Sequence, residues 1–221
     1  VTVEYDDKTG LPTRLAKVLM SNAIDYRYVP HQEKKRVAQE AKKLAFETLK
    51  DWVDDQTEFL FNPTGEWQAI NSCSAADSGV TGRKLVVQFY GGYPGAQMGG
   101  GAVVNKSPEK VDCCAAFGAR YAAKNVVAAG IADKCSVQLA YAIGIAQPMS
   151  VYVNTFGTGV CPDAEISRAV EEIFDFTPRG MIERFNLLNA ETYRKLPKTF
   201  FLGNYKWEET DLAATLKKRL G

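Results

Sequence analysis

The chain has 221 residues, of which 46% are hydrophobic and 24% are charged, with a formal net charge of +1. This length fits one large domain or two small ones, and the hydrophobic fraction is sufficient to bury a sizeable core. The balanced charge excludes an electrostatic reason to bind nucleic acid or an anionic membrane, and no apolar run approaches the roughly 18 residues of a membrane span.

The first elements along the chain predict a β-hairpin. Val1–Tyr5 alternates apolar and polar residues, and Arg14–Met20 can return as a second strand after turn residues at positions 6–10. Because a domain rarely begins inside a strand and Val1 is not a methionine, we expect this sequence to be part of a longer or processed polypeptide.

A helix and a short strand follow. Apolar residues recur at helical spacing over Gln32–Trp52, and the Lys and Glu side chains between them predict a solvated face. Glu58–Phe61 predicts a strand that is stopped by Asn62-Pro63-Thr64-Gly65.

The middle of the chain predicts two loops around a strand. Residues 71–83 are small and polar, 84–90 are strand-like, and 91–101 are too rich in glycine for regular structure. Ser107-Pro108-Glu109 is a strong helix start, with serine as the cap, and we expect this helix to run to about Ala129 and end at Gly130.

The remaining elements mix strands and helices without strict alternation. Cys135–Ala142 and Met149–Phe156 predict strands, whereas Ala164–Phe174 and Asp211–Leu220 predict helices. This pattern favours an α+β fold in which helices pack on antiparallel sheets.

The cysteines indicate a reducing environment. They are odd in number, and no pair has C-x-x-C spacing: Cys73, Cys113, Cys114, Cys135 and Cys161. We expect reduced thiols, and hence a cytoplasmic location or another reducing intracellular compartment. A zinc site is not expected, because the single histidine, His31, is far from the cysteines in sequence.

Two segments carry residues suited to binding a polyphosphate. Asp77 lies on a glycine-containing loop that leads to Arg83 and Lys84, and a second glycine-rich loop leads to Lys106, Lys110 and Asp112. Glycine-rich backbone can present N–H groups to anions, lysine and arginine add charge, and a carboxylate can hold a divalent metal. Each signal is also compatible with an ordinary turn that has lysines nearby, and neither a P-loop nor a dinucleotide-binding motif is present.

Longer motifs carry a family resemblance. They are Gly79-Val80-Thr81-Gly82-Arg83-Lys84, Tyr90-Gly91-Gly92, Gly99-Gly100-Gly101-Ala102, Lys110-Val111-Asp112, Ala119-Arg120-Tyr121, residues 123–130, 132–135, 141–144 and 155–159, and Trp207-Glu208. Together they resemble the C-terminal part of S-adenosylmethionine synthase (methionine adenosyltransferase), in a divergent form. The resemblance implies units of mostly antiparallel sheet with helices packed on one face, where residues 1–72 end one unit and residues 73–221 form the C-terminal region.

The resemblance also implies an activity. Enzymes of this family are transferases of one-carbon metabolism that join ATP to methionine and then cleave the displaced triphosphate, with Mg²⁺ and K⁺ as cofactors. Their sites form between subunits, so the implied partners are ATP, methionine, and further subunits in a homo- or hetero-oligomer, with no nucleic acid and no membrane span.

Site roles carry over by position. Lys106 and Arg83 would be catalytic, Lys110 would bind methionine, and Asp112 would be a magnesium ligand. The positions that would bind ATP are Asp77, Arg83, Lys84, Ala102 and Lys106, and Asp77 would also contact methionine. As an alternative, Asp112, Arg120 and Lys124, which share one helical stripe, would form only an ion network.

Several positions depart from the family pattern. Where the family has other side chains, this chain has Glu66, Trp67, Gln88, Phe89, Met98, Cys113 and Cys114. The family's His-Pro-Asp motif would lie before Val1. We therefore expect activity only together with a partner or an N-terminal part; the alternative is a catalytically inactive relative that serves as a structural or regulatory subunit.

Overall fold

The computed structural model describes residues 1–6, 8–9, 11–24, 29–65, 90, 106–199 and 203–221. The chain divides into two compact units, one of Val1–Thr81 with Ala142–Ile145 and the other of Gly82–Tyr141 with Ala146–Gly221. Each unit has its own buried core, and each is considered by itself below.

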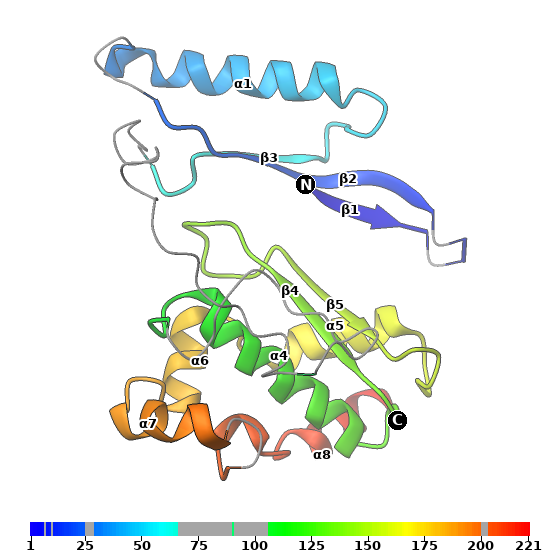
Figure 1. Ribbon diagram of the computed structural model, residues 1–221. Helices are drawn as coiled ribbons and strands as arrows, with labels where there is room; N and C mark the ends of the chain where they lie inside the picture. The colour runs from blue at the N-terminus through cyan, green and yellow to red at the C-terminus, as the bar shows by residue number, and fades with distance from the viewer. Residues whose placement is uncertain (7, 10, 25–28, 66–89, 91–105, 200–202) are drawn as a thin grey trace. The chain divides into compact units, whose positions relative to one another are not determined.

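The first unit contains a three-stranded sheet covered by one helix (Figure 1). Strands β1 (Thr2–Tyr5) and β2 (Pro12–Met20) pair antiparallel, which confirms the predicted hairpin. Strand β3 (Glu58–Phe61) pairs parallel to β2 with the predicted bounds, and the chain turns after it, where the Gly65 N–H donates to the Asn62 carbonyl at 2.7 Å.

Helix α1 (Lys34–Thr48), entered through the short helix η1 (His31–Glu33), packs on this sheet through Ala45 and Phe46. The predicted end of this helix at Trp52 was wrong, because the helix stops at Thr48. The Trp52 carbonyl instead accepts a hydrogen bond of 2.7 Å from the Leu15 N–H of β2. The Trp52 carbonyl is therefore bonded to the sheet, although the apolar periodicity predicted Trp52 to be part of the helix.

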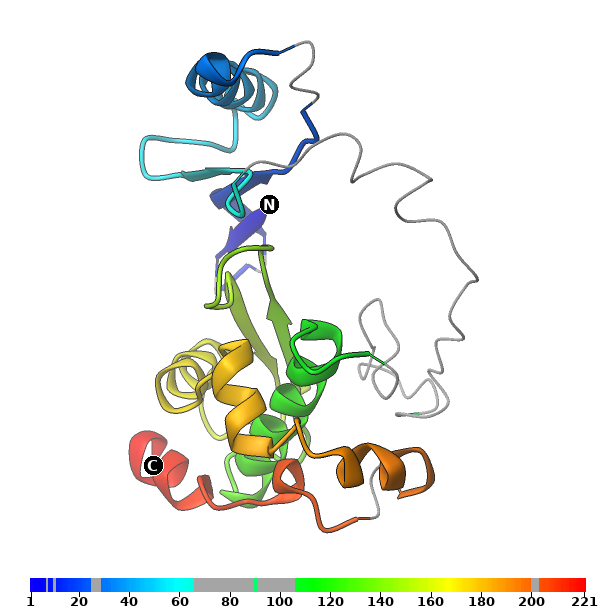
Figure 2. The ribbon, with the colours of Figure 1, turned by 90° about the vertical axis from the view of Figure 1, so that its left-hand side faces the viewer.

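The second unit is built around helix α4 (Val111–Ala128). This helix contacts strand β4 (Ser136–Ala140), helix α6 (Pro178–Phe185), the short helix η3 (Lys206–Glu208) and helix α8 (Ala213–Leu220) (Figure 2). Strand β5 (Ser150–Asn154) pairs antiparallel with β4, and helix α5 (Asp163–Ile173) packs on β5 and α8.

The β4–β5 hairpin has one buried and one exposed face. Val137 pairs with Val153 on the face toward the core, whereas Gln138 pairs with Tyr152 on the exposed face. Helices thus cover one side of an antiparallel pair, and the predicted α+β class is confirmed. Both strands are shorter than predicted; after β5 the chain leaves extended geometry at Phe156, whose φ is +54°.

The predicted start of α4 was wrong by several residues, and its predicted end is confirmed. Ser107 does not cap the helix: its hydroxyl donates to Glu109 at 2.5 Å, and its carbonyl accepts the Lys110 N–H at 3.1 Å, which makes a separate turn. At the other end, Gly130 has a φ of +72°, and its N–H donates to the Val127 carbonyl at 3.0 Å. This left-handed glycine terminates the helix, as the sequence indicated.

Helices α6 and α7 (Ala190–Thr199) were not predicted. The sequence does signal α6, because Thr177 precedes Pro178 and the Thr177 side chain accepts the Gly180 N–H at 3.0 Å. Asn186 ends this helix in the left-handed conformation, with a φ of +53°.

Helix α8 begins at Ala213, two residues after the predicted Asp211. No helix in the described part of the chain is long and apolar enough to cross a membrane.

The buried side chain of Asn125 on α4 is hydrogen-bonded to the backbone of the segment between η3 and α8. Its amide nitrogen donates to the Tyr121 carbonyl at 2.8 Å and to the Glu209 carbonyl at 3.2 Å, and its amide oxygen accepts the Leu212 N–H at 2.9 Å. Trp207 next to this connection is fully buried, with its ring stacked between Phe117 and Tyr205. The segment from Tyr205 to Leu212 is therefore attached to α4 by both polar and aromatic contacts.

We expect Asn125→Ala to lower the free energy of unfolding by about 1–3 kcal/mol, because it removes the buried amide that bonds to the Leu212 N–H and to the Glu209 carbonyl. Urea denaturation followed by circular dichroism measures the change. Asn204→Ala, at an exposed position, is the control and should change stability by less than about 0.5 kcal/mol. Equal stability of the two variants would contradict this role of Asn125.

Candidate functional site

Two of the predicted site residues, Lys106 and Asp112, lie in contact at the start of α4. Lys106 precedes the turn over residues 107–110, and Asp112 lies in the first turn of the helix. The turn brings the chain back so that the Lys106 ammonium forms an ion pair and hydrogen bond with Asp112 Oδ2. Each side chain is 33% exposed, so both remain accessible from solvent.

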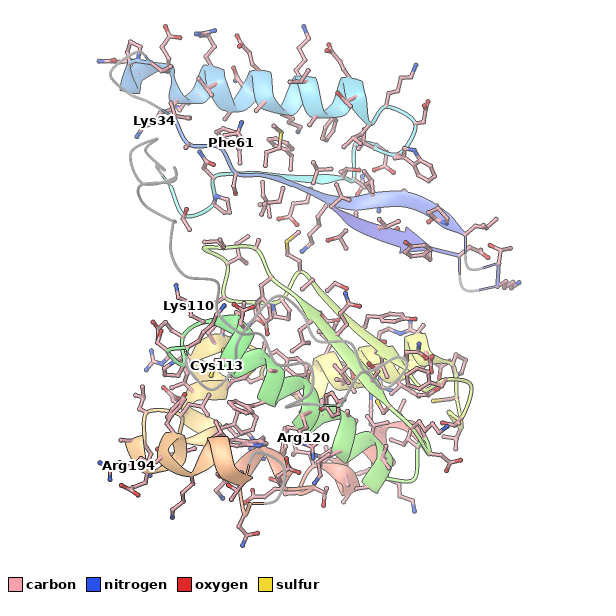
Figure 3. The ribbon with its side chains drawn as sticks, in the orientation of Figure 1. Lys34, Phe61, Lys110, Cys113, Arg120 and Arg194 are labelled. Atoms are coloured by element: carbon pink, nitrogen blue, oxygen red, sulfur yellow. The ribbon has the colours of Figure 1, made fainter. Side chains whose placement is uncertain are left out.

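Lys110 is the residue immediately before α4, and it is exposed (Figure 3). Its carbonyl accepts the Cys113 N–H at 2.8 Å and the Cys114 N–H at 3.1 Å, which begins the helical hydrogen-bond ladder. The backbone of Lys110 therefore belongs to the helix, while its side chain is exposed to solvent. Together, Lys106, Lys110 and Asp112 present two cations and one carboxylate at one end of α4.

The other predicted site residues lie outside the described residues. These are Asp77, Arg83, Lys84 and Ala102, together with the predicted loops 71–83 and 91–101 and the predicted strand 84–90 apart from Tyr90. In the part of the chain that the structure describes, no three histidine, cysteine, aspartate or glutamate side chains cluster as a metal site. Asp112 offers one carboxylate of the type that Mg²⁺ prefers, and this carboxylate is paired with the Lys106 ammonium.

Asp112, Arg120 and Lys124, which the sequence places on one helical stripe, do not pair with one another. They belong to two separate groups of ion pairs. Arg120 binds Glu208 of η3 through two hydrogen bonds of 2.5 and 2.9 Å, and Lys124 binds the same carboxylate at 2.7 Å. Arg120 also donates to the Tyr90 hydroxyl at 3.4 Å. The ion-network alternative therefore describes Arg120 and Lys124, whereas Asp112 pairs with Lys106 instead.

Glu208 was not recognised as the partner of these cations. Its side chain is only 12% exposed, and its two oxygens are shared by Arg120 and Lys124. The sequence contains a signal, since two cations four residues apart on one helix face favour a common acid. The acid comes from a segment more than 80 residues later, which the sequence pattern does not identify.

Cys113 and Cys114 follow Asp112 and are fully buried. The Cys113 sulfur lies 3.7 Å from the Tyr193 hydroxyl, and the Cys114 sulfur lies 3.5 Å from the Lys110 carbonyl. Burial raises the pKa of both thiols, that of Cys114 to about 12. The four described cysteines are free, and these two are held as neutral core side chains next to the charged group.

This burial predicts an order of thiol reactivity. At pH 8, iodoacetamide should modify partly exposed Cys161 at least about tenfold faster than Cys113 or Cys114, because the thiolate is the nucleophile and burial disfavours it. Site-resolved mass spectrometry of the labelled protein measures the three rates. In denaturant the rates should converge, and rapid labelling of Cys114 in the folded protein would contradict the buried placement.

Comparison with known proteins gives a consistent set of similarities. The family description "S-adenosylmethionine synthetase, C-terminal domain" matches residues 72–209. S-adenosylmethionine synthase of Nitrobacter hamburgensis is 40% identical, with 99% of this chain and 54% of the relative covered. The enzyme of the same name from Bradyrhizobium diazoefficiens is 39% identical, with 100% of this chain and 55% of the relative covered.

A solved structure is similar as well. It is described as an unusual S-adenosylmethionine synthetase from Campylobacter jejuni, with 34% sequence identity and a TM-score of 0.57. The alignment covers 99% of this chain and 58% of that protein. The present chain thus spans about half the length of the relatives that it matches.

Proposed function

The chain belongs to the S-adenosylmethionine synthase family, and we propose that it supplies the polyphosphate-binding part of a site that converts ATP and methionine to S-adenosylmethionine with cleavage of the triphosphate. The observation that carries this proposal is the contact between Lys106 and Asp112. It joins a phosphate-binding cation to a magnesium-binding carboxylate, which are the two kinds of group that a bound metal–polyphosphate needs.

In this proposal each member of the pair exchanges its partner when substrate binds. Lys106 would bind the oxygens of the triphosphate, and Asp112 would hold Mg²⁺, which would supply positive charge against the phosphates. Without substrate the two side chains neutralise each other. Binding of the metal and of the polyanion should therefore be coupled, because each releases the residue that the other requires.

The remaining site assignments are part of the same proposal. Arg83, Lys84 and the Ala102 backbone would complete the ATP site, Arg83 acting with Lys106 on the leaving triphosphate, and Asp77 would contact both ATP and methionine. Lys110 would lie near methionine, which its exposed position before α4 permits. K⁺ would assist as in the family, and no described residue is assigned to it.

We assign the rest of the site to a partner subunit or to another part of the polypeptide. The family's His-Pro-Asp motif is not among these 221 residues. In the same proposal, residues 1–72 complete one structural unit of the family and residues 73–221 form its C-terminal region. The free thiols of the described cysteines fit the reducing compartment that we propose for the protein.

An inactive structural or regulatory subunit is the second candidate. The observation that favours it is the complete burial of Cys113 and Cys114, the positions at which the family has arginine and serine. A buried thiol in place of a guanidinium removes a cation from the start of α4. Glu66, Trp67, Gln88 and Met98 also replace family residues, and Glu66 introduces an acid that would disfavour a polyanion nearby.

Lys106→Met provides the sharpest test of the exchange. It should weaken tripolyphosphate binding in the presence of Mg²⁺ roughly 10- to 100-fold, since a charge-assisted hydrogen bond contributes about 1.5–3 kcal/mol. The same variant should strengthen binding of Mg²⁺ alone, because Asp112 loses its competing ammonium. Isothermal titration calorimetry with each ligand, alone and together, measures both effects.

Lys218→Met on the exposed surface of α8 is the matched control and should leave both affinities unchanged. Asp112→Asn should reduce the coupling between Mg²⁺ and tripolyphosphate to what their direct binding to each other gives. Unchanged tripolyphosphate affinity in Lys106→Met would refute the assignment of Lys106.

An activity measurement distinguishes the two candidate functions. The chain alone and with its copurifying native partners is given ATP and methionine, and S-adenosylmethionine and triphosphate products are quantified. We expect turnover only in the assembled sample. The absence of both turnover and nucleotide binding in that sample would favour the inactive subunit, whereas turnover by the isolated chain would contradict the need for a partner.

A further inference from the structure

The second unit contains a partly open cavity of about 190 Å³ that none of Lys106, Lys110 and Asp112 lines. Its walls come from the middle of α4, from the segment after α5, from α6 and from Leu212 before α8. Figure 2 shows α6 running beside α4, and the two helices are in contact. The cavity therefore lies inside one compact unit.

Most of the cavity wall is aromatic or aliphatic. Phe174 and Phe176 are stacked with ring centroids 5.8 Å apart, and Tyr121 meets Phe174 edge-on at 5.3 Å. Gly118 contributes only backbone, and a Cβ there would lie 2.5 Å from the Met181 sulfur. An enclosed apolar cavity of roughly 150 Å³ is large enough to bind benzene, so the volume of this partly open cavity is of the size of an aromatic ring or a branched aliphatic group.

Arg184 supplies a positioned cation in the wall of the cavity. One of its nitrogens, Nη2, donates to Asp211 Oδ2 at 2.5 Å and also to the Tyr121 hydroxyl. Its guanidinium lies over the Tyr121 ring, 4.7 Å from the centroid, which fixes its orientation. Its Nε and Nη1 make no hydrogen bond to the residues that the structure describes, and the side chain is 41% exposed. These donors remain able to bind a carboxylate.

Asp175 supplies the opposite charge to the same wall. Its Oδ1 accepts the Thr177 N–H at 2.9 Å, and its carboxyl group lies against Gly180 in the first turn of α6. This backbone contact orients the carboxylate and leaves it able to accept further hydrogen bonds. The cavity thus combines an apolar interior with one acid and one base.

We propose that this cavity binds a free α-amino acid with an aromatic or branched apolar side chain. The side chain would occupy the space among the Phe174, Phe176 and Met181 side chains, the carboxylate would accept from Arg184, and the ammonium would donate to Asp175. A zwitterion suits this wall because it adds no net charge. A simple anion would face Asp175 without compensation, whereas a simple cation would bind Asp175 but leave the remaining Arg184 donors unused, since Arg184 pairs with Asp211 through Nη2.

Titration of the ¹⁵N-labelled full chain with L-phenylalanine tests the proposal. We expect saturable amide shifts in residues 173–185, with a Kd of roughly 1 mM or tighter. The single-charge analogues 3-phenylpropionate and 2-phenylethylamine should bind at least about tenfold more weakly, because each can make only one of the two charge-assisted contacts of the zwitterion. Equal affinity for either analogue, or no saturable shift with L-phenylalanine, would overturn the proposal.

Two variants assign the binding to this cavity. Arg184→Gln should weaken L-phenylalanine at least about tenfold, whereas Arg179→Gln, at an exposed position on the same helix that does not line the cavity, should not. Leu212→Trp places a larger side chain at the wall and should abolish binding, which keeps the test decisive if Arg184→Gln fails to fold. Unchanged affinity in a folded Arg184→Gln or Leu212→Trp protein would overturn the assignment. The proposal is independent of polyphosphate binding at Lys106.

Discussion

The second unit depends on the burial of helix α4. This helix is surrounded by β4, α6, η3 and α8, and nine of its residues are buried. Its alanines allow these neighbours to approach closely, and Gly118 allows the Met181 side chain to pack directly against the helix backbone. Because α4 is packed on several sides, its rotation about its own axis is fixed. The polar side chains on it therefore face defined neighbours.

The fixed orientation of α4 places different polar groups in different surroundings along its length. At the start, Asp112 remains partly exposed and meets Lys106. Further along, Arg120 and Lys124 extend toward η3, where both bind the Glu208 carboxylate. On another side, Tyr121 faces the cavity that Arg184 borders. The proposed polyphosphate group, the structural ion network and the proposed amino acid cavity are therefore all positioned by the packing of α4.

Local signals in the sequence predicted those elements in which local and tertiary preferences agree. The β1–β2 hairpin and the bounds of β3 follow from side-chain alternation and turn residues, and Gly130 ends α4 because it adopts a positive φ. The predictions failed where a backbone group found a competing partner. The Trp52 carbonyl bonds to β2, and Ser107 forms a turn of its own, so two helix boundaries moved.

The amino-acid sequence by itself determined the family, the α+β class and the identity of Lys106 and Asp112 as candidate residues, because long motifs and periodic patterns are properties of the chain order. Only the tertiary structure decided which charges pair. Asp112 shares a stripe with Arg120 and Lys124, yet it binds Lys106, while the other two bind Glu208 from more than 80 residues away. Periodicity specifies the face on which a side chain lies, whereas its partner is specified by the packing of distant segments against that face.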